Sequence, residues 1–263
     1  MECPLCKTRQ TGTKKSHIIP KMFRNELGGA KSQIKIKKVQ PAEEKQDKRN
    51  HQDIPKEEGL LCDECEHNLS VLEGYFAKNV YAVIQSKAYN DKYRIKKGVN
   101  STRKEVDEID IQLVSLFYQS IIYRQHISNL DSFKECVIDE SLLEKLRNQL
   151  HMILADNPTD MIANYEKAKK DFHFMPFVNW TVNKERQDDN FLGGVPNKDG
   201  KHLLMLNNVR AVVVEDIGKI KRYRSNYSKS DETTLKMYVK SKADWRDNSK
   251  DVVMEIEDYL DKI

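Results

Sequence analysis

The sequence lacks a long apolar run. None of its segments approaches the about 20 consecutive apolar residues of a membrane-spanning helix, so an integral membrane protein is not expected. Residues 1–6 show neither the basic nor the apolar region of a secretory signal, so we expect a cytoplasmic protein. Apolar residues make up only 38% of the 263 residues and charged residues 33%, which predicts that part of the chain forms loops rather than core.

The sequence also lacks a strong excess of one charge. It has 45 Lys and Arg against 41 Asp and Glu, a net charge of +4, which excludes a histone-like composition. The basic residues are nevertheless unevenly spread, with twelve against six acidic residues over 14–57 and ten against four over 218–250. Either stretch can form a phosphate-binding face or can simply keep the protein in solution, and the sequence leaves both alternatives open.

Cysteines are few, but their spacing is informative. Four of the five form two Cys-x-x-Cys pairs, Cys3 with Cys6 and Cys62 with Cys65. A reducing compartment disfavours disulfides, and without a thioredoxin-like βαβ pattern two such pairs favour a metal over redox chemistry. Because each pair can chelate from a single turn, we predict one structural Zn²⁺ site. The fifth, Cys136, is expected to be a small buried apolar residue.

Apolar residues recur at three- and four-residue steps in several segments, and this spacing predicts helices. The predicted helices cover residues 63–86, with a break near Gly74, and residues 107–128, 141–155, 158–170 and 251–263. On the second of them, Arg124 and His126 are expected to serve packing or salt bridges.

Other segments predict strands or loops. Strands are expected near Ile18-Ile19, at 172–182, at 201–205 and at 209–214, the last two joined by a turn at Asn207-Asn208. The charged segments 40–58 and 100–104 predict a mobile loop and a polar break, and 219–250 is only weakly periodic. The predicted fold class is α+β. We expect a zinc module at residues 1–95 and, at 96–263, a helical accessory domain with a small antiparallel β element.

Three segments together resemble a known family. They are Cys3-x-x-Cys6, Ser16-His17-Ile18-Ile19-Pro20 and Leu61-Cys62-x-x-Cys65-Glu66. In this order they resemble the zinc-containing HNH endonucleases, the treble-clef branch of the ββα-metal superfamily. The resemblance covers about residues 1–85, and it is closest to bacterial proteins of uncharacterised function with the same His-Ile-Ile-Pro and Leu-Leu-Cys-x-x-Cys segments.

The resemblance implies roles for particular residues. His17 matches the general base, and an ordinary histidine pKa of about 6.5 suits proton abstraction near neutral pH. Glu66 takes the place of a metal-ligating histidine, and a carboxylate favours Mg²⁺ or Mn²⁺ as the catalytic ion. The basic residues expected to contact DNA phosphates are Lys14, Lys15, Lys21 and Arg24.

The sequence departs from the family at several positions. Ser16 replaces a stronger metal ligand, and Ser70 stands where a further His or Asn often lies. Candidate residues to complete the metal site are Glu58, Asp53 and Glu73, whereas His67 is rotated about 100° from Glu66 around a helix. In the alternative interpretation, His17 only orients the zinc loop and Glu66 only favours the helix dipole.

The resemblance implies a metal-dependent endonuclease that hydrolyses DNA phosphodiester bonds. Many small HNH proteins act in bacterial phage defence beside an ATPase, which makes an ATPase a candidate protein partner by analogy. The alternative is a non-catalytic zinc module that binds nucleic acid or a protein. The sequence predicts neither an oligomeric state nor a cleavage site.

Overall fold

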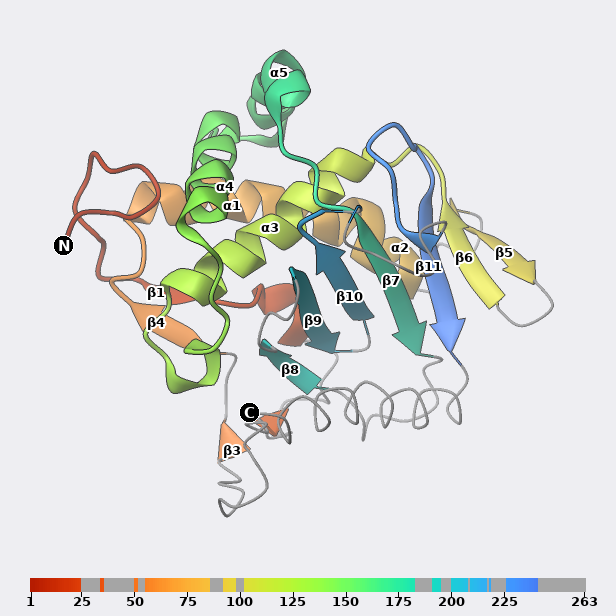
Figure 1. Ribbon diagram of the computed structural model, residues 1–263, viewed down its shortest axis with the longest axis horizontal. Coiled ribbons are helices and arrows are strands. Elements are labelled where there is room, and N and C mark those ends of the chain that lie inside the picture. Colours follow the sequence, from red (N-terminus) through yellow and green to blue (C-terminus); the bar gives the residue numbers. More distant parts are fainter. Residues whose placement is uncertain are drawn as a thin grey trace.

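The structure, a computed structural model, has the α+β class that the sequence predicts (Figure 1). A short β-ribbon and helix α1 (Asp63–Phe76) lie near the N-terminus, helix α3 (Ile111–Ile127) crosses the middle, and a seven-stranded sheet lies at the other end. The predicted helix at 251–263 lies outside the described residues. The structure describes residues 1–24, 34–35, 50–51, 55–85, 92–97, 102–182, 191–194, 200–207, 209–216, 218 and 226–240.

The N-terminal part is a β-ribbon followed by a helix. Strand β1 (Lys15–His17) pairs antiparallel with β4 (Lys56–Glu58), and the chain then enters α1. Between these strands, β2 (Ile34–Lys35) pairs antiparallel with β3 (Asn50–His51). The order is therefore ribbon, then helix, with the Cys-x-x-Cys pairs flanking the ribbon in sequence.

The short strand predicted near Ile18-Ile19 is present as β1, which ends at His17, and the two isoleucines follow it and are fully buried. One sequence prediction for this ribbon is wrong. The loop predicted at 40–58 contains the strands β3 and β4. Strand β4 has no apolar residue from which a strand could be predicted, because only one face of the ribbon is covered.

Helix α1 begins where a cysteine caps it. The Sγ atom of Cys62 accepts a hydrogen bond from the backbone N–H of Cys65 (3.4 Å) and so satisfies one of the free N–H groups of the first turn. Three carboxylates in that turn lie at the positive end of the helix dipole. They belong to Asp63, Glu64 and Glu66.

The helix continues through Gly74 without the predicted break. It passes into a π-helical segment (Ala77–Tyr81) and then into α2 (Ala82–Gln85), so helical structure covers nearly all of the predicted 63–86. Gly74 is exposed, and a Cβ atom added there would contact nothing within 4 Å.

Replacing Gly59 with alanine should destabilise the protein, whereas the same change at Gly74 should stabilise it. Gly59 links β4 to the segment before α1 at φ +74°, where a Cβ atom costs about 1–2 kcal/mol. At the open helical position of Gly74, alanine should add about 0.5–1 kcal/mol to the free energy of unfolding. Urea unfolding measures both; a loss of stability in Gly74→Ala would contradict this prediction.

The large sheet has the strand order β5-β6-β11-β7-β10-β9-β8. Strands β11 and β7 run parallel, and the other neighbours are antiparallel. The strands are β5 (Arg94–Lys97), β6 (Thr102–Val106), β7 (Phe177–Val182), β8 (Phe191–Gly194), β9 (Lys201–Asn207), β10 (Val209–Val214) and β11 (Leu235–Lys240).

The predicted small antiparallel element is a larger sheet that contains one parallel pair, β11–β7, and its β9–β10 hairpin is confirmed. The polar break predicted at 100–104 contains the start of β6, and the weakly periodic segment 219–250 contains β11. The predicted strand at 172–182 is confined to β7.

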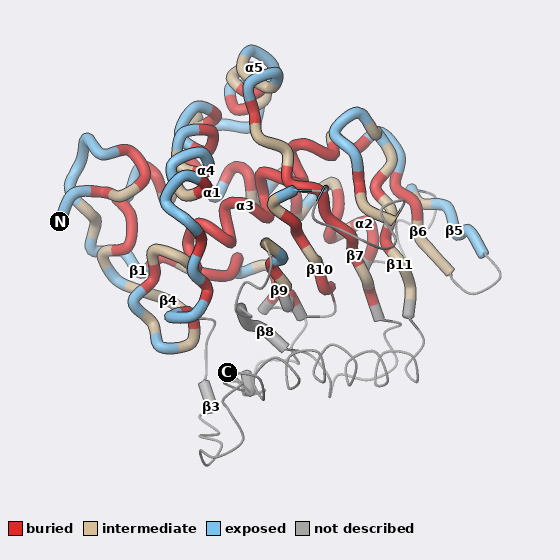
Figure 2. Tube along the Cα trace, in the orientation of Figure 1, coloured by how far each residue is buried: buried red, intermediate tan, exposed pale blue. Residues whose placement is uncertain are grey.

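Helix α3 is more deeply buried than the amphipathic helix that the sequence predicts (Figure 2). It begins after Asp110, whose carboxylate accepts hydrogen bonds from two N–H groups of the first turn. Phe117 stacks on Phe76 of α1, with ring centroids 3.9 Å apart. The next residue, Tyr118, also lies against Phe76 (ring centroids 5.7 Å apart) and donates a hydrogen bond to Asn179 Oδ1 of β7 (2.8 Å). The helix is thus buried because both α1 and the sheet pack against it.

The hydrophobic core is continuous across the predicted domain boundary at 95–96, because Phe76 precedes this boundary and Phe117 follows it. Helices α4 (Glu140–Ile153) and α5 (Pro158–Ala168) confirm the predicted helices at 141–155 and 158–170. Cys136 is buried, as predicted. Among the helices that the structure describes, none is long and apolar enough to cross a membrane.

Candidate metal centre and adjoining polar site

The first cysteine pair lies in a tight N-terminal loop. The Cys3 N–H donates to the carbonyl oxygen of Arg9 (2.7 Å), and the Lys7 N–H donates to that of Cys3 (2.9 Å). Lys7 takes a left-handed backbone conformation with φ 54°, which turns the chain directly after Cys6. These contacts point both thiols of the loop toward the start of α1.

The second pair comes from the start of α1. Cys62 precedes the helix and Cys65 lies in its first turn. The backbone N–H of Cys62 donates to Sγ of Cys3 (3.3 Å), so the helix start and the N-terminal loop are in direct contact. Gly12 N–H also donates to the carbonyl oxygen of Leu61 (2.9 Å), which holds the chain after the loop against the same segment.

The four sulfur atoms form one buried cluster. The Sγ atoms of Cys3, Cys6, Cys62 and Cys65 all lie within 4.8 Å of one another, and those of Cys6 and Cys62 are 3.9 Å apart. Tetrahedral zinc with Zn–S bonds of about 2.3 Å separates its sulfur ligands by about 3.8 Å. The four cysteines are therefore positioned to hold a metal ion such as Zn²⁺, as the sequence predicts.

Hydrogen bonding and burial shift the pKa values of the thiols in the cluster. A hydrogen bond with Cys65 lowers the pKa of Cys3 to about 4, while that contact and burial raise the pKa of Cys65. Metal binding requires deprotonated sulfurs, so an ion bound by all four thiolates would replace these protons.

A polar site adjoins the cluster, between the β-ribbon and α1. Ser16 of β1 is fully buried, and its hydroxyl group is close enough to Glu66 to lower the pKa of that carboxyl. Burial nevertheless raises the pKa of Glu66 overall, with the charge of Arg124 opposing the rise. Ser16 Oγ and Glu66 Oε1 are both buried and have no hydrogen bond of standard geometry among the described residues.

A buried arginine from α3 completes this site. Arg124 is only 1% exposed, and its Nη1 donates to Glu73 Oε1 (2.7 Å) and to the backbone oxygen of His17 (2.8 Å). Its other nitrogens donate to Ser120 of the same helix. Arg124 therefore joins α3 to both α1 and β1. Its predicted salt-bridge role is confirmed.

The structure places the predicted catalytic residues close to this site. His17 follows Ser16 in β1, its ring is partly buried, and Glu66 lies one residue after Cys65 in α1. Strand β1 and helix α1 are connected in two ways. Ser16 lies next to Glu66, and Arg124 bonds to the backbone oxygen of His17 and to Glu73. The sequence does not indicate either connection.

The additional candidate ligands lie in different environments. One oxygen of Glu73 is held by Arg124. Glu57, opposite Ser16 in the ribbon, accepts hydrogen bonds from Ser128 and Asn129 just after α3 and therefore braces the ribbon. Glu58 and His67 are exposed, and Asp53 lies outside the described residues.

Three of the predicted DNA-contacting residues are exposed. Lys14 has 69% of its side chain exposed and lies 3.6 Å from Asp63, a surface pair of little energetic value. Lys15 and Lys21 are also exposed, at β1 and at the start of a 3₁₀ helix (Lys21–Arg24). The side chain of Arg24 lies outside the described part of the chain.

No protein-family model, curated protein or solved structure matches the chain. The function is therefore inferred from its residues and their geometry.

Proposed function

We propose that this chain is a zinc-stabilised HNH-like endonuclease that hydrolyses DNA phosphodiester bonds. The supporting observation is the four-cysteine cluster, which joins the N-terminal loop and β-ribbon to the start of α1. This junction brings Ser16 of β1 against Glu66 of α1, beside His17. A β-ribbon followed by a helix, with four cysteines at their junction, supports the proposal of a treble-clef ββα module.

In this proposal His17 accepts a proton from the attacking water. Glu66 would hold Mg²⁺ or Mn²⁺, with the Ser16 hydroxyl as a neutral ligand, because both offer buried oxygen atoms without a standard hydrogen bond among the described residues. When bound, such an ion would stabilise the charge that develops on the phosphate and on the leaving oxygen. Lys14, Lys15, Lys21 and Arg24 would contact neighbouring phosphates.

Arg124 supplies a fixed positive charge in this proposal. At 1% exposure it does not reach a phosphate, but it balances the carboxylates of Glu66 and Glu73. The same observation favours a second candidate, a non-catalytic zinc module that binds nucleic acid or a protein. With Arg124 already beside both carboxylates, a divalent ion is less strongly required for charge balance.

His17→Ala should lower the rate of cleavage of supercoiled plasmid by about 10²- to 10⁴-fold, the usual contribution of a general base. His67→Ala is the matched control, because His67 is exposed and lies next to Glu66 in the chain. Wild type and both variants are assayed with Mg²⁺, with Mn²⁺ and with neither ion added. A wild-type protein that cuts under none of these conditions would refute the enzyme proposal.

A gel shift at two salt concentrations then separates the non-catalytic alternatives. Binding to nucleic acid should weaken steeply as salt rises, because counterions are released from the phosphates. A module that binds only protein should show little binding to DNA at either salt concentration.

A further inference from the structure

One row of side chains runs across five strands of the large sheet. Lys96 of β5 lies opposite Arg103 of β6, Arg103 opposite Tyr238 of β11, Tyr238 opposite Trp180 of β7, and Trp180 opposite Arg210 of β10. Residues directly opposite each other on neighbouring strands share one face of a sheet. The order across this face is therefore two cations, two aromatic rings and a buried cation.

This row lies on the face that points away from α3. Side chains alternate between the two faces of a strand. The neighbours of the row on the other face, among them Met237, Asn179 and Ala211, are fully buried, and Asn179 is bonded to α3. Tyr238 and Trp180 are instead only half-buried. The row is thus a second surface of the sheet and not part of its helix-covered core.

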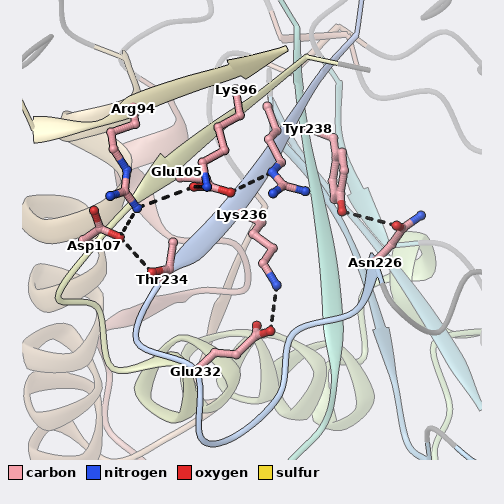
Figure 3. A network of polar contacts seen from close by, with 10 residues as sticks. Arg94, Lys96, Glu105, Asp107, Asn226, Glu232, Thr234, Lys236 and Tyr238 are labelled. Carbon is pink, nitrogen blue, oxygen red and sulfur yellow. Dashed lines mark hydrogen bonds and ion pairs between the residues drawn. The ribbon is translucent and has the colours of Figure 1, made fainter. Parts of the chain in front are cut away.

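A buried carboxylate holds the cations of this face in place (Figure 3). Glu105, with only 3% of its side chain exposed, lies 2.7 Å from Arg103, 3.0 Å from Lys96 and 3.6 Å from Arg94. Arg94 and Lys96 remain 58% and 55% exposed, and Arg94 also binds Asp107. The carboxylate therefore orders three cations while their outer N–H groups stay in contact with solvent.

We infer that this surface binds single-stranded nucleic acid. We call it the cation–aromatic face, and it consists of Arg94, Lys96, Arg103, Trp180, Tyr238 and Lys236. Lys236 lies two residues before Tyr238, on the same face of β11, and its Nζ is 2.7 Å from Glu232. Neighbouring aromatic rings can stack on unpaired bases, and ordered cations beside them can bind the phosphates between those bases. A duplex keeps its bases stacked inside and cannot use the rings, and an acidic peptide offers charge but no base to stack. The inference concerns binding and is independent of the proposed cleavage at His17.

The experiment measures the fluorescence anisotropy of labelled oligo(dT) and of a duplex of equal length, without added Mg²⁺ or Mn²⁺. We expect oligo(dT) to bind more tightly than the duplex. Trp180→Leu should weaken this binding about tenfold or more, since stacking on one base contributes about 1–3 kcal/mol. Circular dichroism and thermal unfolding confirm that the variant is folded.

Lys96→Gln and Lys97→Gln form a matched pair, because both remove one charge from β5 but from opposite faces. Only Lys96→Gln should weaken binding, and it should reduce the slope of log affinity against log salt by about 0.7. In a Trp245→Phe background Trp180 is the only tryptophan, and its fluorescence should be quenched by oligo(dT).

Several results would overturn the inference. They are no binding of oligo(dT), equal binding of the duplex, equal effects of the two lysine variants, and equal competition by poly-glutamate. His17→Ala should bind oligo(dT) as wild type does. If His17→Ala loses cleavage but still binds oligo(dT), the loss supports the nuclease proposal and leaves the binding inference unchanged. The two proposals can therefore fail separately.

Discussion

Cys62→Ser should abolish metal binding and unfold the N-terminal module. The variant leaves three sulfurs, and structural zinc in small modules contributes about 10–16 kcal/mol of apparent binding free energy that is also folding free energy. Serine is a good N-cap residue, so the start of α1 keeps a capping side chain. Any loss of stability in the variant is therefore due to the missing metal ligand and not to a missing helix cap. We expect about one zinc per chain in wild type, none in the variant, and a Tm lower by more than about 10 °C.

Cys136→Ala is the control for this experiment. It also removes a buried cysteine, but one that lies far in sequence from the cluster and outside it. Its zinc content should equal that of wild type. If Cys62→Ser retained both its zinc and its Tm, the four-sulfur site would be wrong.

Arg124→Met should lower the free energy of unfolding by about 3–5 kcal/mol, the typical cost of removing one partner from a buried ion pair. The change leaves Glu73 without its cation, removes the donor to the backbone oxygen of His17, and takes positive charge away from the partly buried Glu66. Methionine fills a similar volume, so a cavity contributes little to this loss. Urea unfolding followed by circular dichroism measures it.

Arg147→Met is the matched comparison. Arg147 of α4 also donates to a backbone oxygen of the N-terminal loop, that of Leu5 (3.2 Å), but its carboxylate partner Glu144 is half-exposed. The solvent screens this pair, so its loss should lower the free energy of unfolding much less than the loss of Arg124 does. Adding Glu73→Met to Arg124→Met should recover part of the larger loss, because the carboxylate that was bonded to Arg124 is then removed as well. Equal costs for the two arginine variants would contradict the role assigned to Arg124.

Local chemistry in the sequence predicts the metal cluster and most helices. The Cys-x-x-Cys spacing places two metal ligands within a single turn of the chain. The second pair, Cys62 and Cys65, lies at the start of α1. The hairpin β9–β10 likewise follows from a short Asn-Asn connection between two apolar runs. In each case the decisive residues are neighbours in the chain.

Features that depend on distant residues are not predictable in this way. The sequence shows Arg124 only as a charge among apolar residues, whereas its partners lie 51 and 107 positions away. Strands β5 and β6 consist largely of Lys, Arg, Glu and Thr, because all residues of the edge strand β5 are exposed and β6 is fully buried only at its end. Such strands lack the apolar pattern by which strands are detected.

The position of β11 has a consequence for the order in which the protein forms. This strand, from residues 235–240, lies between β6 and β7 and is the link that attaches the β5–β6 hairpin to the rest of the sheet. More than a hundred further residues must therefore be synthesised after β6 before its partner β11 is available for pairing. Contacts of such long sequence separation slow folding, so the hairpin should join the sheet late, after the helices and β7–β10 have assembled.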